Sequence, residues 1–271
     1  MRCHTFLSQC VQRGWLACFL IAAVHTIASA QTSDVAREKR FADEIISQLV
    51  VGEAVQIPVS GNKGYASFLG LLAEAANKSK PAIVLAHGVG THPEEGLTGE
   101  LRKRLHDLGY TTLAIQMPIA AKEAQVDDYF PKLFPEASAR LDAAANWLKA
   151  KGYARPVLVS HTMGSWMANV YFDEQSKSTS YKAWVCISLT GGYSFATRNY
   201  PFPILDLYGE NDIGVTVSSA WRRNGLLRLA FDGSQQVKVA GADAQWRGKE
   251  GEAAQQIDAF VKKCCPDRSW S

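Results

Sequence analysis

Histidine is scarce in this sequence and is absent from its C-terminal part. The 271 residues include six histidines, the last of which is His161. The chain beyond that residue therefore offers no imidazole for acid–base chemistry or metal binding. The sequence also lacks the clustered His, Cys or carboxylate spacing of a metal site and the lysine-containing glycine-rich loop that binds nucleotides. We expect neither a metal ion nor a cofactor.

Long apolar runs are also missing, apart from one near the N-terminus. Arg2 and Arg13 precede an apolar segment at residues 15–27, and Ala28-Ser-Ala30 follows it. This order is typical of a secretory signal peptide with its cleavage site. The segment is shorter than the roughly 20 residues that span a bilayer. We expect residues 1–30 to be removed, the remainder to be periplasmic or secreted, and no stable membrane span after cleavage.

Cysteine and net charge are low in the remaining chain. Outside the predicted signal peptide the cysteines are Cys186, Cys264 and Cys265, too few for a disulfide framework. In an oxidising compartment Cys264 and Cys265 could pair with each other or with another chain. The signal peptide holds two of the 29 basic residues and none of the 26 acidic ones, which leaves the rest nearly neutral. Near-neutral charge argues against nucleic acid or an anionic membrane surface as a partner.

Strand and helix patterns alternate through residues 31–271, which we interpret as a single α/β domain. Helices are expected at 34–50, 99–108, 135–151, 164–173 and 250–263, and strands at 54–59, 65–72, 82–86, 111–116, 156–160, 183–189, 203–208 and 235–240. This order predicts a mostly parallel sheet with helices on both faces and an antiparallel N-terminal hairpin. In such sheets ligands bind beyond the carboxyl ends of the strands.

The most informative stretch is residues 157–165, Val-Leu-Val-Ser-His-Thr-Met-Gly-Ser. An apolar β-branched run leads directly into small residues and then a helical pattern, which predicts a strand, a sharp turn and a helix. A nucleophile on such a turn has its oxygen exposed above the sheet, and the N–H of the next residue can stabilise an oxyanion. Thr162 is the candidate nucleophile and Met163 the candidate donor. Ser160 and Gly164 are the small residues on either side.

A second informative loop, His-Gly-Val-Gly-Thr-His-Pro at 87–93, follows an expected strand. Gly88 and Gly90 allow the backbone to approach a ligand closely. The loop resembles the His-Gly loop that supplies one backbone N–H to the oxyanion hole of α/β-hydrolases, and this resemblance makes the N–H of Val89 the second candidate donor. His87 is expected to orient the loop rather than to act as a base.

With these motifs, residues 82–263 resemble the α/β-hydrolase superfamily, and the chain is similar to an exported bacterial branch of it. The resemblance implies a catalytic acid at the end of residues 205–212, Leu-Asp-Leu-Tyr-Gly-Glu-Asn-Asp, which is Asp212. It also implies a catalytic histidine shortly after Val239-Ala-Gly, where this chain has Ala244. The expected triad is therefore degenerate, with Thr162 at the nucleophile position and Ala244 at the histidine position.

Two functions from different classes are consistent with these residues. The first is an exported, catalytically impaired protein that keeps a pocket for a small molecule or acyl ligand, because an alcohol without an adjacent base is a weak nucleophile. The alternative is an active esterase or acyl hydrolase that uses Thr162, Asp212 and an unconventional base. His92 is considered first as that base, because geometry rather than chain order defines a triad. His161 is expected to point away from the turn.

Two further segments are candidates for the walls of the pocket. Residues 117–135 form a long connection that could fold over the site as a lid. The aromatic residues within 190–203 would either form a wall of the pocket or pack beneath a loop. A lining role would favour an apolar or acyl-bearing ligand. The sequence indicates no particular oligomeric state.

Overall fold

The computed structural model describes residues 33–59, 66–129, 131–175, 179–194, 202–229 and 232–266. The predicted signal peptide, residues 1–30, lies outside the described residues, as does the turn predicted between the first two strands. Among the described residues, no helix is both long and apolar enough to cross a bilayer.

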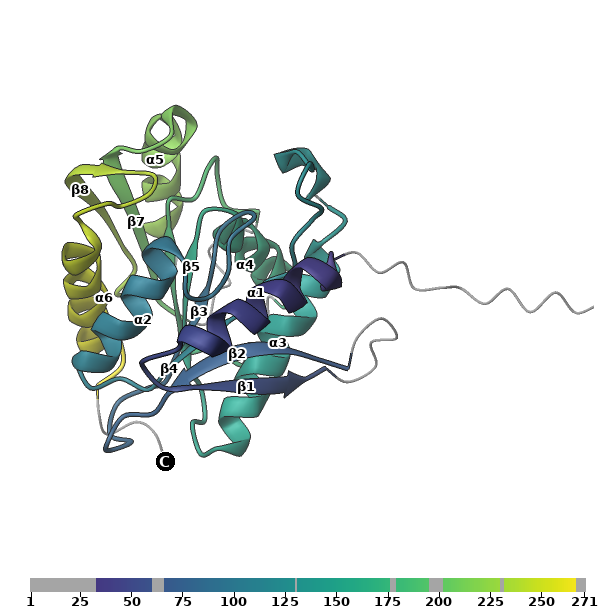
Figure 1. Ribbon diagram of the computed structural model, residues 1–271. Helices are drawn as coiled ribbons and strands as arrows, with labels where there is room; N and C mark the ends of the chain where they lie inside the picture. The colour runs from purple at the N-terminus through teal and green to yellow at the C-terminus, as the bar shows by residue number, and fades with distance from the viewer. Residues whose placement is uncertain are drawn as a thin grey trace, which may run out of the picture.

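One sheet contains all eight described strands. They are β1 Glu53–Pro58, β2 Ser67–Ala73, β3 Ile83–Ala86, β4 Thr112–Ile115, β5 Val157–His161, β6 Ala183–Ile187, β7 Ile204–Asn211 and β8 Gln235–Asp243. Their order across the sheet is β1-β2-β4-β3-β5-β6-β7-β8. β2 pairs antiparallel with both β1 and β4, and the pairs from β4 to β8 are parallel (Figure 1). The predicted mostly parallel sheet with an antiparallel N-terminal hairpin is confirmed.

Helices cover both faces of this sheet. They are α1 Val35–Gln48, α2 Gly96–Asp107, α3 Phe134–Ala150, α4 Met163–Glu174, α5 Gly214–Leu227 and α6 Glu250–Cys264, with a short 3-10 turn, η1, at Val126–Asp128. Side chains of a strand alternate between the faces: in β3, Val84 packs in the core with α3 and α4, whereas Ile83 and Leu85 pack in the core with α2 and α6. Burial on both faces explains why the central strands are continuous apolar runs.

Helix α5 is the main element that the sequence did not predict. It begins with Gly214 and three β-branched residues and contains a second glycine, so its intrinsic helix propensity is low. Tertiary contacts compensate. Arg223 on α5 and Asp206 on β7 are both fully buried and form an ion pair. Arg223 Nε donates to Asp206 Oδ2 at 2.8 Å. Such packing, rather than propensity, supplies most helix stability in proteins.

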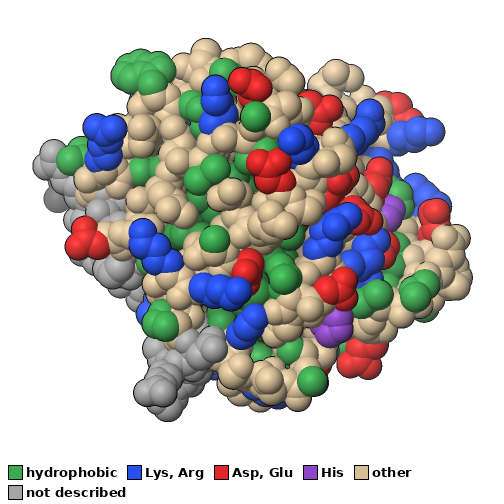
Figure 2. All heavy atoms as spheres, turned by 90° about the vertical axis from the view of Figure 1, so that its left-hand side faces the viewer, with side chains coloured by type: hydrophobic (Ala, Val, Ile, Leu, Met, Phe, Trp, Pro, Cys, Tyr) green, Lys and Arg blue, Asp and Glu red, His purple; other side chains and the backbone are tan. Residues whose placement is uncertain are grey.

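The charge pattern of the surface agrees with the near-neutral composition. Figure 2 shows lysine and arginine side chains interspersed with aspartate and glutamate over the face that it presents. The described ion pairs include exposed pairs one helical turn apart, such as Lys39 with Asp43. Pairs of this kind contribute little to stability.

Candidate functional site

Thr162 occupies the sharp turn between β5 and α4, as the sequence predicts. Its φ is 47° and its ψ is −111°, a region that is strained for a β-branched residue. Backbone hydrogen bonds hold the turn: the Thr162 N–H donates to the Ile187 carbonyl at 3.0 Å, and its own carbonyl accepts from Ser165 and Trp166 at 3.0 and 3.1 Å. The hydroxyl itself bonds to no group among the described residues, so it is available to a ligand.

Two glycines let the loops close around this hydroxyl. A Cβ on Gly88 would overlap Thr162 Oγ1, and a Cβ on Gly164 would lie 2.5 Å from the His87 carbonyl oxygen and 2.7 Å from that of Ala86. At Gly164 the clash is with backbone atoms, so that position requires glycine. At Gly88 it is with one side-chain oxygen, so a larger residue there would have to displace the Thr162 hydroxyl. The loop after β3 and the start of α4 are therefore in direct contact at Thr162.

The two predicted oxyanion donors lie on these same segments. Val89 follows Gly88 directly, and Met163 is the first residue of α4. Neither N–H donates to an acceptor within the part of the chain that the structure describes. Unpaired N–H groups at a helix start and in an adjoining loop favour a negatively charged or carbonyl oxygen between them. This arrangement is consistent with the predicted role, which depends on both donors facing one ligand atom.

His87 orients the loop. Its Nε2 accepts from the Met117 N–H at 2.9 Å, which requires Nδ1 to carry the proton and to donate to the Gly88 carbonyl at 2.8 Å. Burial lowers the pKa of His87 to about 3, so the ring is neutral. Arg37 on α1 also supports the loop, because its guanidinium donates to the carbonyls of Gly90 at 3.0 Å and Ala120 at 3.1 Å.

Asp212, the predicted acid, is buried at the end of β7 and is held by three donors. Ser188 Oγ donates to Oδ2 at 2.5 Å, and the N–H groups of Gly209 and Ile213 donate to Oδ2 and Oδ1 at 3.3 and 2.7 Å. Ser188 Oγ in turn accepts from Trp246 Nε1 at 3.0 Å. The sequence reasoning missed both partners, since neither carries a local pattern. Ser188 and Trp246 have positive φ angles of 55° and 60°.

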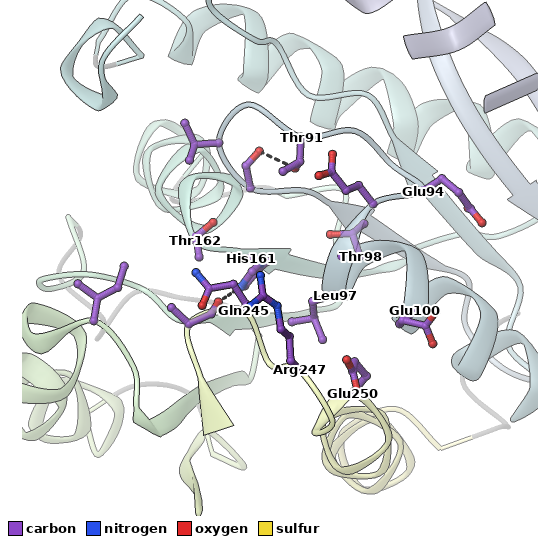
Figure 3. Close-up of a pocket in the computed structure, with 16 residues that line it drawn as sticks. Thr91, Glu94, Leu97, Thr98, Glu100, His161, Thr162, Gln245, Arg247 and Glu250 are labelled. Atoms are coloured by element: carbon purple, nitrogen blue, oxygen red, sulfur yellow. Dashed lines mark hydrogen bonds between the residues drawn. The ribbon is translucent and has the colours of Figure 1, made fainter. Parts of the chain in front are cut away.

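Ala244 lies just beyond β8 and lines the same cavity as Thr162. Its backbone carbonyl accepts from His161 Nε2 at 2.9 Å. The expectation that His161 points away from the turn is therefore wrong: its ring lines the cavity and lies between Thr162 and the loop that carries Gln245 (Figure 3). Burial lowers the pKa of His161, while the Ala244 carbonyl and the nearby Asp212 carboxylate partly oppose the change.

His92, the base considered first from the sequence, is engaged elsewhere. Its Nδ1 accepts from the Glu94 N–H at 3.3 Å, its Nε2 lies 3.6 Å from a Glu95 carboxylate oxygen, and its ring packs against Phe41 of α1. It does not belong to the lining of either cavity that reaches Thr162. The structure thus brings Thr162 together with His161 and Ala244, and leaves His92 at the loop edge.

Two cavities meet at Thr162, Val89 and Ile213. The larger, about 540 Å³, has a mixed polar lining, and Glu94, Glu100 and Glu250 lie at its end away from Thr162 (Figure 3). The smaller, about 330 Å³, is mainly apolar and is lined by Val126, Asp127, Phe134, Met163, Trp166 and Thr190 besides the shared residues. Apolar walls with a few placed polar groups are typical of small-molecule sites. A ligand at Thr162 could extend into both.

Of the two segments expected to form walls of the pocket, 117–135 contributes to the lining, whereas the described aromatic side chains of 190–203 do not. Residues 126 and 127 of the expected lid do border the apolar cavity. The described aromatic side chains of the expected wall, Tyr193 and Phe202, are buried instead and pack against Trp184 and Phe172. Residues 195–201 lie outside the described part.

The cysteine and metal expectations concern other parts of the fold. Cys186 is buried in β6, and Cys264 and Cys265 are free thiols whose sulfur atoms lie 2.9 Å apart. Within the described ranges, no group of three or more His, Cys, Asp or Glu side chains is arranged to hold a metal ion.

Solved structures with the same fold include several hydrolases. Est1E from Butyrivibrio proteoclasticus, with ferulic acid bound, has a TM-score of 0.61 at 14% identity, over 78% of this chain and 99% of that one. Dienelactone hydrolase from Anabaena variabilis has a TM-score of 0.60 at 17% identity, over 78% and 96%. A serine hydrolase without lid from Xanthomonas campestris has a TM-score of 0.58 at 12% identity, over 80% and 96%.

These likenesses and the strand order show that the chain has the α/β-hydrolase fold. No protein-family model matches the sequence, and no curated protein matches it either. At identities this low the shared architecture says nothing about substrate, so function must be argued from the site.

Proposed function

We propose that this protein is exported and binds a small ester or acyl compound at Thr162, with hydrolysis that is strongly impaired relative to a complete triad. One observation carries the proposal. The unpaired Thr162 hydroxyl lies at the junction of an apolar and a polar cavity, next to two unpaired N–H groups, while Ala244 occupies the position where the resemblance implies the base. The binding features are kept and the base is missing from that position.

The expected impairment is large. In hydrolases of this kind, removal of the base lowers turnover by on the order of 10⁶, and roughly 10³ to 10⁴ over the reaction in water remains from the oxyanion donors and binding. Thr162 adds a second cost, because a β-branched residue is strained at the positive φ of 47° that this turn requires.

A second candidate function is an active acyl hydrolase that uses Thr162, Asp212 and an unconventional base. The observation that favours it is the His161 ring in the same cavity as Thr162. The two candidates share the ligand class and differ in rate, so a kinetic experiment separates them.

The test is hydrolysis of short- and medium-chain 4-nitrophenyl esters by residues 31–271. The parent is compared with Thr162→Ser/Ala244→His and with Thr162→Ala. We expect turnover in the double variant and little in the parent. Rapid parental turnover that Thr162→Ala abolishes would establish the second candidate instead.

Binding is measured separately from turnover. Ferulic acid, which is bound to Est1E in a similar structure, is a suitable aryl acid probe, because Trp166 lines the apolar cavity and its fluorescence would report occupancy. Trp166→Phe controls for the signal of the other tryptophans. An absence of any binding or acylation by the probes would contradict the proposal as a whole. Export is tested by fractionating cells that express the full chain and determining the N-terminal residue of the product.

A further inference from the structure

The hydrogen bond of His161 determines where its proton lies. A carbonyl oxygen only accepts, so the 2.9 Å contact with the Ala244 carbonyl requires the proton on Nε2. In the neutral ring Nδ1 is then an acceptor. Within the described residues nothing donates to Nδ1, and the ring lines the cavity at Thr162.

Nδ1 and the Thr162 hydroxyl face the same small space. The space beside Gly88 shows this. A Cβ placed on Gly88 would overlap Thr162 Oγ1 and would lie 3.7 Å from His161 Nδ1. The two atoms therefore flank one position beside the predicted oxyanion loop. Two atoms on either side of one position can exchange a proton through one bridging water.

The other described histidines are unsuited to this role. Both ring nitrogens of His87 are occupied by backbone groups, and His92 lies outside the cavities. His106 lies in the last turn of α2. The Asp212 carboxylate, by contrast, lies close enough to His161 to favour its protonated form. In a triad the acid hydrogen-bonds to the imidazole. Here Asp212 bonds to Ser188, Gly209 and Ile213 instead, and it acts on His161 through its charge alone.

We propose that His161, held by the Ala244 carbonyl and supported by Asp212, is the general base for acyl transfer to Thr162. This inference rests on the second candidate function under Proposed function, the active acyl hydrolase, because it requires both an acyl ligand at Thr162 and a working base. The base would thus come from the residue that precedes the nucleophile, and not from the loop after β8.

The step balances without a further reactant. The proton on Oγ1 moves to Nδ1 as Oγ1 bonds to the acyl carbon, and the carbonyl electron pair moves to the oxygen that faces the N–H groups of Val89 and Met163. Collapse of this intermediate breaks the bond to the leaving alcohol oxygen, which receives the proton from the imidazolium. Water then attacks the acyl-threonine with the same ring as base.

The experiment measures acylation of Thr162 directly. The purified protein is incubated with 4-nitrophenyl butyrate, and the butyryl adduct is followed by intact mass and located by peptide mapping. His161→Gln is the informative variant, because the glutamine amide can still donate to the Ala244 carbonyl but supplies no basic nitrogen. Thr162→Ala is the control for acylation elsewhere, and thermal unfolding and ferulic acid binding check that each variant is folded.

We expect His161→Gln to slow acylation by about 10²- to 10⁴-fold, the range of general-base contributions. Ferulic acid binding should change by less than about threefold, as expected for loss of an interaction used only in the transition state. The same ratio should appear between Thr162→Ser and Thr162→Ser/His161→Gln, where the primary alcohol gives a larger signal. Acylation of His161→Gln within about threefold of the parent would overturn the inference.

The pH profile of parental acylation gives a second readout that needs no variant. The neutral ring is the active form, so the rate should be constant near neutrality and fall only below the ordinary histidine pKa of about 6.5. Titratable groups facing the ring are Asp212 and His87, and the cavity also contains Glu94, Glu95, Glu100, Arg247 and Glu250. A parent that binds ferulic acid but is never acylated would refute the role of His161 and leave the proposed ligand class standing.

Discussion

A methyl group added at Gly88 would test the contact on which the candidate site depends. In Gly88→Ala the new Cβ would overlap Thr162 Oγ1, whereas the next nearest atoms, His161 Nδ1 and the His161 carbonyl oxygen, lie at an ordinary 3.7 Å. Gly88 does not have a positive φ, so the backbone itself tolerates alanine. Overlap in a packed site costs about 1–3 kcal/mol of unfolding free energy.

The clash involves one oxygen atom, so a second substitution should remove it. We expect Gly88→Ala to lower the unfolding free energy of the parent by about 1–3 kcal/mol. In the Thr162→Ala background the same substitution should cost less than about 0.5 kcal/mol, so the coupling energy between the two positions should nearly equal the cost in the parent. Urea denaturation of the four proteins in this cycle measures it. An equal cost in both backgrounds would refute the geometry described for Gly88 and Thr162.

Two further predictions concern buried ionisable groups. His87 has its pKa lowered to about 3 by burial, against 6.5 when exposed, so the unfolded chain binds a proton first, and stability should fall by up to about 5 kcal/mol between pH 6.5 and 3. His87→Gln should flatten that part of the curve in denaturant titrations, and an unchanged curve would contradict the assignment. Arg223→Leu leaves the buried Asp206 carboxylate without its ion-pair partner, with the Gln236 amide still donating to it, and should cost about 3–5 kcal/mol. Lys39→Met, which breaks an exposed pair, should cost less than about 1 kcal/mol. Similar losses of unfolding free energy in these two variants would show that burial does not determine how much an ion pair contributes to stability.

The N-terminal helix contributes more to the site than its position in the chain suggests. Arg37 on α1 bonds to the carbonyl of Gly90 in the predicted oxyanion loop and to that of Ala120. Glu38 on the same helix pairs with Arg140 of α3 at 2.9 Å, and both side chains are largely buried. Helix α1 therefore supports the loop that carries Gly90, although the two segments are far apart in the sequence.

Local sequence patterns were sufficient for the fold and for the positions of the key loops. Apolar runs followed by small residues located the turn at Thr162 and the loop at Gly88, whereas the choice of Ala244 came from the resemblance to the α/β-hydrolase superfamily. Helix α5 was missed because its glycines and β-branched residues favour other conformations, and tertiary contacts such as the buried pair of Arg223 with Asp206 compensate for this.

The sequence by itself determined the strand–helix alternation, the turn residue Thr162 and the absence of any histidine beyond residue 161. Each of these depends on neighbouring residues or on composition alone. The tertiary structure decided which histidine reaches Thr162, because His161 is held by a carbonyl 83 residues away and His92 by contacts with Phe41 on α1. It also decided that Ser188 and Trp246 support Asp212. Side-chain directions of this kind follow from long-range packing and hydrogen bonds, which no local pattern encodes.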